Sequence, residues 1–218
     1  MTDRPLRARE LPAVVYERTL LSVAPRMRGA LALRFFRLLY PGFTVGPGAR
    51  CWGTVHVTMG RGSSISIGEK LWMVSDSRRA GIALHSPCKL RTMAGARLSI
   101  GDHVGLNGTS ITCRTRIDIG SGTIVAANVA IVDSDFHRQW PPEERFFEAG
   151  QESDRAVSIG RNVWIGMGSM ILKGTTIGDG SIIAAGSVVS GAIPANVLAA
   201  GVPARVIRDL TPEPAEGA

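Results

Sequence analysis

The sequence predicts an all-β protein in which the chain winds into a triangular coil whose sides are six residues long. Two observations predict this fold. Branched aliphatic residues recur every six positions over much of the chain, and the 218 residues include 26 glycines but only 6% aromatic residues. A six-residue period matches neither the 3.6-residue helix nor the two-residue alternation of a strand. Excess glycine with few aromatic residues is typical of many tight turns around a narrow core.

The repeat is clearest in the C-terminal third. Aliphatic residues follow one another there in steps of six, at Ile159, Ile165, Ile171, Ile177, Ile183 and Val189. The positions four residues later are mostly small, at Val163, Ser169, Thr175, Ser181, Ser187 and Ile193. We expect the aliphatic residues to stack inside the coil and the small ones to lie at its corners. Glycines directly after the aliphatic residues, at Gly160, Gly166 and Gly178, are expected to give the turns backbone freedom.

The same period is found upstream, at Ile119, Val125 and Ile131 and at Ile100 and Leu106, with weaker matches at Val45, Cys51 and Val57. Each coil can bury its apolar edge only by stacking on the next one, so the array is expected to be stable as a whole.

One segment breaks the period. Ile131 and Ile159 are 28 positions apart, which is not a multiple of six, so Asp133–Ser158 is expected to leave the coil as a loop. Long loops on a rigid scaffold tend to carry function. This loop begins with two carboxylates and His137, and a histidine held at one ring nitrogen can accept a proton at the other. Either Asp133 or Asp135 could hold it, and the sequence does not decide between them.

The segment from Ile119 to His137, together with NVWIGMGSMILKGTTIGDGSIIAAGSVVSGAIPANVLAAGVPARVIR, resembles the hexapeptide-repeat acetyltransferases of the maltose, galactoside and nodulation-factor type. The resemblance covers about residues 43–207 and implies a left-handed parallel β-helix. It divides the chain into an N-terminal helical extension (1–42), the β-helix (43–207, with the loop 133–158) and a C-terminal tail (208–218).

The resemblance implies an acetyl-CoA-dependent O-acetyltransferase acting on a sugar or glycan hydroxyl, with direct transfer and no metal. His137 stands at the position of the family's general base, and Asn107 at that of an asparagine that orients the acceptor or the oxyanion. No GxSxG motif occurs, which disfavours an acyl-enzyme. The alternatives are acylation of an amino-sugar or a small-molecule drug, or a β-helix that only binds. A zinc carbonic anhydrase on the same coil is disfavoured, because no H-x₄-H pair is present.

For coenzyme A, the resemblance implies a groove along a coil edge between subunits of a homotrimer. The matching positions are Trp164 near the thiol end, Met167 and Ala185 along pantetheine, Ser190 near the nucleotide, and Arg205 and Arg208 near the phosphates. The family usually has Lys or Arg after the Ser190 position, where this chain has Gly191. A phosphate contact is therefore missing or comes from elsewhere, with Lys173 as a candidate.

The N-terminal 40 residues hold eight arginines and three acidic residues, hence +5 of the formal charge of +7. Pro25 is suited to the first turn of a helix. Apolar residues then follow at helical spacing, at Met27, Leu31, Phe35, Leu38 and Leu39. We expect this apolar face to pack on the end of the coil, with peripheral contact of residues 1–40 to an anionic membrane as the alternative.

The remaining composition bears on location and partners. Single arginines spread along the chain, with no recognisable nucleic-acid-binding motif, argue against nucleic acid as a partner despite the pI of 10.1. The three cysteines are widely spaced and form no CxxC pair, and no apolar run is long enough to span a bilayer. We expect a cytoplasmic protein that can associate with a membrane.

Overall fold

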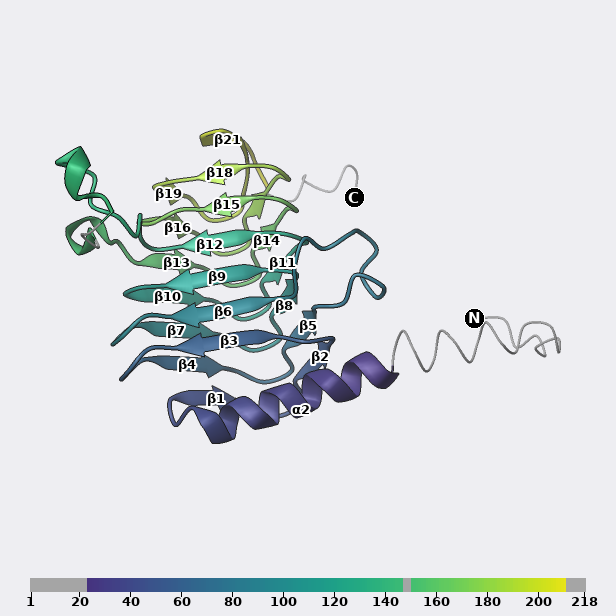
Figure 1. The fold of residues 1–218 in the computed structure, drawn as a ribbon. Coiled ribbons are helices and arrows are strands. Elements are labelled where there is room, and N and C mark those ends of the chain that lie inside the picture. Colours follow the sequence, from purple (N-terminus) through teal and green to yellow (C-terminus); the bar gives the residue numbers. More distant parts are fainter. Residues whose placement is uncertain (1–22, 147–149, 211–218) are drawn as a thin grey trace, which may run out of the picture.

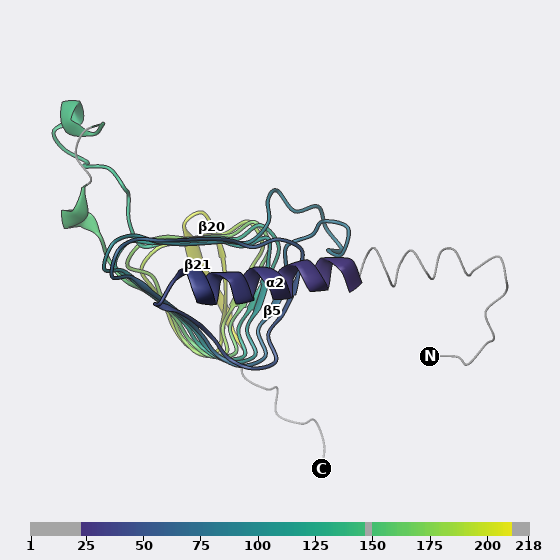
Figure 2. The same ribbon diagram turned by 60° about the horizontal axis from the view of Figure 1, so that its bottom comes forward.

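The computed structural model describes residues 23–146 and 150–210, which form a triangular prism of three parallel sheets preceded by one helix (Figure 1). Consecutive strands enter the three sheets in turn, so that three strands make one turn of the coil. We call the sheets A, B and C in the order in which the chain enters them. Figure 2, turned by 60° from Figure 1, shows the turns of the coil stacked on one another around a three-sided outline.

Sheet A contains β1 (Phe43–Val45), β4 (Ser64–Ile67), β7 (Arg97–Ile100), β10 (Arg116–Ile119), β13 (Val157–Ile159), β16 (Thr176–Ile177) and β19 (Ala192–Ile193). Sheet B contains β2 (Arg50–Trp52), β5 (Trp72–Val74), β8 (Gly105–Asn107), β11 (Ile124–Val125), β14 (Trp164–Ile165), β17 (Ile182–Ile183), β20 (Val197–Gly201) and β21 (Ala204–Asp209). Sheet C contains β3 (His56–Met59), β6 (Lys89–Thr92), β9 (Ser110–Cys113), β12 (Ala130–Val132), β15 (Met170–Ile171) and β18 (Val188–Val189).

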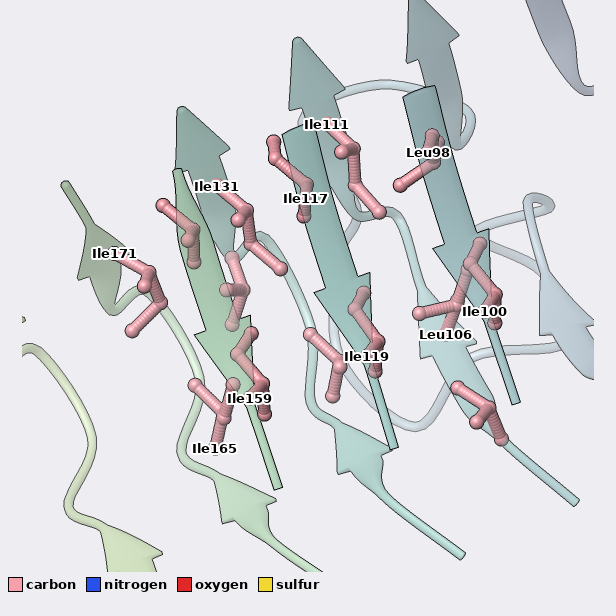
Figure 3. Close-up of a cluster of buried hydrophobic side chains, with 14 of the residues drawn as sticks. Leu98, Ile100, Leu106, Ile111, Ile117, Ile119, Ile131, Ile159, Ile165 and Ile171 are labelled. Atoms are coloured by element: carbon pink, nitrogen blue, oxygen red, sulfur yellow. The ribbon is translucent and has the colours of Figure 1, made fainter. Parts of the chain in front are cut away.

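The aliphatic residues of the repeat fill the inside of the prism. In sheet C, Ile131 pairs in register with Ile111 on one side and Ile171 on the other, and all three side chains are fully buried. Figure 3 shows these columns of stacked side chains. The predicted triangular coil of six-residue sides, with its helical extension and protruding loop, is therefore confirmed.

The small residues at the corners are as buried as the aliphatic ones, and their hydroxyl groups satisfy backbone carbonyls there. Thr175 Oγ1 donates to the Val189 carbonyl at 3.0 Å, and Ser181 Oγ donates to the Pro194 carbonyl at 2.6 Å. A buried hydroxyl group without a partner would cost free energy. The corners thus select residues that are both small and able to form a hydrogen bond.

The glycines that follow the aliphatic residues serve a different purpose from the one expected. Gly166 and Gly178 do not have positive φ angles. A Cβ atom at either position would lie 2.4 Å from a backbone nitrogen of the next coil. These glycines are therefore required by the close approach of two backbones, and the expectation of conformational freedom at these positions is wrong.

Helix α2 (Ala24–Leu39) lies across the first coil, next to β1 and β2 (Figure 1). Gly29 and Leu33 face the coil and are buried, and a Cβ atom at Gly29 would lie 2.1 Å from the Cys51 carbonyl oxygen. The predicted face points outward instead: Met27, Leu31, Phe35, Leu38 and Leu39 are each at least 50% exposed. The expectation that this face packs on the coil is wrong, because the small Gly29 lets the opposite face approach the strands more closely.

Two segments leave the prism, at two different corners (Figure 2). Residues 133–156 leave between β12 and β13, at the corner of sheets C and A, and include the 3₁₀ turns η2 (Pro142–Glu144) and η3 (Gln151–Ser153). Residues 75–88 leave between β5 and β6, at the corner of sheets B and C. We call them the CA loop and the BC loop. The BC loop was not predicted from the sequence.

Within the described residues, no helix is both long and apolar enough to cross a membrane.

Candidate active site

A pocket of about 590 Å³ lies at the corner of sheets B and C, between the coil and the BC loop. Four of the predicted site residues line it: Asn107, Trp164, Met167 and Ala185. The BC loop forms the opposite wall with Arg79, Ala80, Gly81 and Ile82. The structure thus brings the predicted pantetheine and acceptor positions together in one mostly apolar pocket, which we call the corner pocket.

One asparagine fixes the BC loop to the coil. Asn128 lies between β11 and β12, two turns of the coil beyond the BC loop, with a left-handed backbone (φ 62°), which asparagine tolerates better than most residues. Its Oδ1 accepts the His85 N–H at 2.9 Å, and its Nδ2 donates to the Ala83 carbonyl at 3.0 Å. These two hydrogen bonds hold the loop beside the pocket.

His137 lies in the CA loop with its side chain exposed. Its Nδ1 is 2.8 Å from the Arg145 carbonyl oxygen. Because a carbonyl oxygen can only accept a hydrogen bond, this contact favours the tautomer with the proton on Nδ1. Nε2 then carries the lone pair that can accept a proton.

The backbone around His137 is tightly constrained. Phe136 has a left-handed conformation (φ 61°), unusual for a bulky residue, and its N–H donates to Ser134 Oγ at 2.9 Å. Gly150 packs so closely that a Cβ atom there would lie 2.3 Å from the His137 carbonyl oxygen. Arg145 also donates through Nε and Nη2 to the Gln139 carbonyl at 3.2 and 3.1 Å. These contacts fix the ring on an otherwise irregular loop.

Neither of the two aspartates contacts His137, so the expectation that one of them fixes its tautomer is wrong. Asp133 is fully buried, and its carboxylate accepts the backbone N–H groups of Arg114, Thr115 and Arg116 at 2.7–2.9 Å. It therefore holds the start of the CA loop to the previous coil. The Arg145 carbonyl occupies the position that the sequence analysis assigned to a carboxylate.

Asp135 instead belongs to a polar network at the base of the loop. Its Oδ2 is 2.5 Å from Lys173 Nζ and accepts hydrogen bonds from Gln139 and Ser153. Burial opposes ionisation of Asp135, but the hydrogen bonds from Lys173 and Gln139 outweigh it and lower the pKa of this carboxyl group below its ordinary value. Lys173 is thus committed to an ion pair, which argues against the expectation that it replaces the missing phosphate contact.

The predicted residues for the nucleotide end of coenzyme A lie apart from the corner pocket. Ser190 follows β18 at the corner of sheets C and A, the same corner as His137. Arg205 and Arg208 are exposed on β21. Gly191, where the family has a basic residue, has φ +85°, a conformation that favours glycine over residues with a Cβ atom.

Within one chain, the structure therefore divides the predicted site between two corners. His137 and Ser190 belong to the corner of sheets C and A, whereas Asn107 and Trp164 belong to sheet B and its corner with sheet C.

The pocket wall in the BC loop and its anchor Asn128 were not predicted from the sequence. The break in the period after Met73, followed by the polar run SDSRRAG, was a signal that could have revealed the loop.

The three cysteines are buried and unpaired. Burial raises the pKa of Cys51 to about 12 and also raises the pKa values of Cys88 and Cys113. Their thiols stay protonated and inaccessible, so none is suited to carry an acyl group. Among residues 23–146 and 150–210, no cluster of three or more His, Cys, Asp or Glu side chains could hold a metal ion.

Comparison with known proteins agrees with this architecture. The family described as "Bacterial transferase hexapeptide (six repeats)" matches residues 156–191. Nodulation protein L of Rhizobium meliloti (strain 1021) is 42% identical over 113 residues, which cover 51% of this chain and 60% of that protein. Galactoside O-acetyltransferase of Escherichia coli (strain K12) is 38% identical over 117 residues, which cover 53% of this chain and 56% of that protein. The chain therefore spans a little over half the length of these curated relatives.

A solved structure of a galactoside acetyltransferase in complex with coenzyme A matches over 97% of this chain and 86% of its own, with a TM-score of 0.50 and 26% identity. The prism is thus the left-handed parallel β-helix that the resemblance implies. In its repeat, its fold and these relatives, the chain is similar to the hexapeptide-repeat acetyltransferases.

Proposed function

We propose that the protein is an acetyl-CoA-dependent O-acetyltransferase that acts on a sugar or glycan hydroxyl group. The observation that carries this proposal is His137, whose Nδ1 is engaged by the Arg145 carbonyl so that Nε2 is left to act as a base. The acetyltransferase relatives, one of them solved with coenzyme A, support the donor, and the galactoside enzyme supports a sugar acceptor.

The reaction then proceeds in one displacement. His137 Nε2 takes the proton of the acceptor hydroxyl as its oxygen attacks the thioester carbonyl, and the tetrahedral intermediate collapses to an acetyl ester. The coenzyme A thiolate leaves and takes up the proton from the imidazolium. General-base assistance of this kind contributes about 10²–10⁴-fold to the rate. In this proposal Asn107, which lines the corner pocket, donates a hydrogen bond to the oxyanion or orients the acceptor.

We propose further that the protein is a homotrimer in which each site lies between two subunits. In this arrangement His137 from one subunit's CA loop faces the corner pocket of its neighbour, with Asn107 and Trp164. This supplies a reason for the division of the predicted site between two corners of one chain. Cyclic assemblies repeat one such contact around their axis.

Coenzyme A is proposed to lie along this groove. Its pantetheine arm contacts Trp164 and the backbone at Met167 and Ala185, Ser190 lies near the nucleotide, and Arg205 and Arg208 bind phosphates. Arginine suits this role because its guanidinium group forms paired, charge-assisted hydrogen bonds with phosphate.

A test of the function compares His137→Ala with the control His103→Asn. His103 lies at a different corner, and its left-handed backbone (φ 57°) is one that asparagine tolerates. Turnover of acetyl-CoA with a panel of sugars is measured by release of free thiol. We expect His137→Ala to lose at least about 10²-fold in kcat while the control retains the wild-type rate. Turnover of His137→Ala at the wild-type rate would overturn the mechanism, and absence of any wild-type turnover would favour a β-helix that only binds.

The alternative acceptors, an amino-sugar or an amine-bearing drug, are distinguished from a sugar hydroxyl by the chemical stability of the acetylated product. An O-acetyl ester is cleaved by hydroxylamine at neutral pH, whereas an N-acetyl amide resists it.

We also propose that helix α2 makes peripheral contact with an anionic membrane, in keeping with a role in polysaccharide assembly on the cytoplasmic side. Its exposed apolar face includes Leu31 and Phe35, and residues 24–39 carry four arginines and no acidic residue. Apolar insertion together with basic charge is the usual basis of interfacial helix binding.

A further inference from the structure

A second pocket, of about 530 Å³, lies between helix α2 and the first two strands of sheet B. We call it the arginine–tryptophan pocket, and it is lined by Val23, Arg26, Met27, Ala30, Arg50, Trp52, Trp72 and Arg79. Nothing in the proposed transfer of the acetyl group uses these residues, except that Arg79 also lines the corner pocket.

The chemistry of this pocket suits an anion attached to an apolar or aromatic group. The rings of Trp52 and Trp72 are in contact, with centroids 4.4 Å apart. The Arg50 guanidinium carbon lies 5.8 Å from the centre of the Trp72 ring, and that of Arg79 lies 5.8 Å from the centre of the Trp52 ring. Cation–π contact holds both guanidinium groups in place but leaves their N–H groups to bind a ligand.

No carboxylate lines the pocket. Within the described part of the chain, the ion pairs involve Arg78, Arg114, Arg116, Arg138 and Lys173, and none involves the three arginines of this pocket. Three arginines lining one pocket that no carboxylate lines leave a net positive charge that a phosphate or diphosphate group would neutralise.

One row of outward-facing residues connects the two pockets. In register across sheet B, Arg50 pairs with Trp72, Trp72 with Gly105, Gly105 with Ile124, and Ile124 with Trp164. The row then continues through Ile182 and Leu198 to Arg208. It thus has an arginine at each end, and Gly105 and Ile124 lie between its two tryptophans.

The length of this row fits a particular kind of acceptor. Trp72 and Trp164 are three strand spacings apart, or about 14 Å. A hexose joined to a diphosphate can bridge this distance, so that a sugar hydroxyl lies near Trp164 and the phosphates lie near Arg50 and Arg79. Gly105, whose missing side chain leaves only Ile124 Cγ2 within 4.0 Å of a Cβ position, gives room for the sugar between them.

We propose that the arginine–tryptophan pocket binds the diphosphate of a glycosyl diphosphate, the activated form in which a sugar is attached to its carrier. This inference rests on the proposed function and defines its acceptor class: coenzyme A enters from the Arg208 end of the row and the acceptor from the Arg50 end. The tryptophans and the apolar side of the pocket, Val23 and Met27, receive the first part of the carrier, which is either a nucleoside or a polyprenyl chain.

The experiment measures binding directly, without any turnover. Tryptophan fluorescence of the full-length protein is titrated with UDP, with farnesyl diphosphate below its critical micelle concentration, and with methyl glucoside. The test variant is Arg50→Gln/Arg79→Gln, and the matched control is Arg61→Gln, an exposed arginine outside both pockets. Far-UV circular dichroism and the unfolding midpoint verify that each variant is folded.

We expect at least one diphosphate to bind, with its Kd raised tenfold or more in the double variant and unchanged in the control, and no response to methyl glucoside. A response to UDP alone indicates a nucleotide carrier, and a response to farnesyl diphosphate alone indicates a lipid carrier. Binding of neither ligand, or equal binding by the double variant, would overturn the proposal.

Coenzyme A also contains a diphosphate, so the probe could bind at the donor site. Titration of the probe in the presence of saturating coenzyme A distinguishes the donor site from the arginine–tryptophan pocket. Binding of the probe should persist in its presence, since the two ligands are assigned to opposite ends of the row. Full competition would assign the pocket to the donor and overturn the inference. Equilibrium dialysis of coenzyme A alone tests the proposed function separately, so that the two failures can be distinguished.

Discussion

At the residue scale, the candidate base is held by backbone groups and not by a carboxylate. The Arg145 carbonyl faces His137 Nδ1, and Gly150 packs against the His137 backbone. A carbonyl oxygen adds no formal charge to the site. The ring is therefore oriented by a neutral backbone group.

Substitution of Gly150 tests this arrangement. Gly150→Ala would place a methyl group against the His137 carbonyl, whereas Gly62→Ala places one in open space at a similar left-handed φ angle (51° and 68°). The backbone cost of about 1 kcal/mol or more is shared by both variants, so their difference reports the clash alone. We expect Gly150→Ala to lower kcat by at least about tenfold relative to Gly62→Ala, because displacement of a base from its productive geometry is costly. Equal kcat values in the two variants would show that this contact does not position His137.

The sequence could identify His137 as a candidate because its loop interrupts a strict period. It could not identify what holds the histidine. Asp133 and Asp135 are close to it in sequence, but the first carboxylate is turned inward to the backbone of β10 and its preceding turn, and the second toward Lys173. Contacts made across a loop, such as that between Gly150 and His137, depend on a path that no local pattern encodes.

At the element scale, helix α2 uses its smaller face for packing and leaves its larger apolar residues exposed. Hydrophobic spacing predicted the helix correctly, since Ala24–Leu39 begins with Pro25 in its first turn. It did not predict the buried face, because burial here depends on how closely the backbone of Gly29 can approach β2.

Two neighbouring leucines allow this arrangement to be tested in one helix. Leu33 is 5% exposed and Leu31 is 61% exposed. We expect Leu33→Ala to lower the free energy of unfolding by about 2–4 kcal/mol, and Leu31→Ala by less than about 1 kcal/mol, in urea denaturation.

In co-sedimentation with vesicles containing phosphatidylglycerol, we expect Leu31→Ala to have a larger effect on binding than Leu33→Ala. Leu31→Ala is expected to weaken binding several-fold, up to about tenfold, because it removes apolar surface that would enter the bilayer. If wild-type protein does not sediment with these vesicles, or Leu31→Ala binds them equally well, α2 does not contact membranes through this face.

At the scale of the whole molecule, the repeat determined the architecture almost completely. A six-residue period fixes the path of the chain, the order in which successive strands enter the three sheets, and which side chains stack inside. The period breaks between Met73 and Leu90, which are 17 positions apart, but this break alone does not show that the intervening BC loop folds back over the coil as a pocket wall.

The division of the site between corners leads to a prediction about mixed assemblies. Two inactive variants, His137→Ala and Asn107→Ala, are unfolded together in equal amounts and refolded. If each site takes His137 from one subunit and Asn107 from its neighbour, random trimers should recover about one quarter of wild-type activity, since one arrangement in four restores both residues. A mixture of His137→Ala with the double variant is the control and should remain inactive. No recovery in the first mixture, with trimers verified by sedimentation, would place both residues of a site in one subunit.

The two ends of the coil are finished differently from its middle. Inside the stack, every turn is hydrogen-bonded to a turn above and a turn below, and such a ladder has no built-in length. At one end helix α2 lies across β1 and β2, and at the other β21 runs antiparallel to β20 and ends sheet B. Exposed strand edges are templates for further pairing. These two elements thus cover the strand edges at the two ends of the coil. They prevent separate molecules from stacking end to end into a fibre.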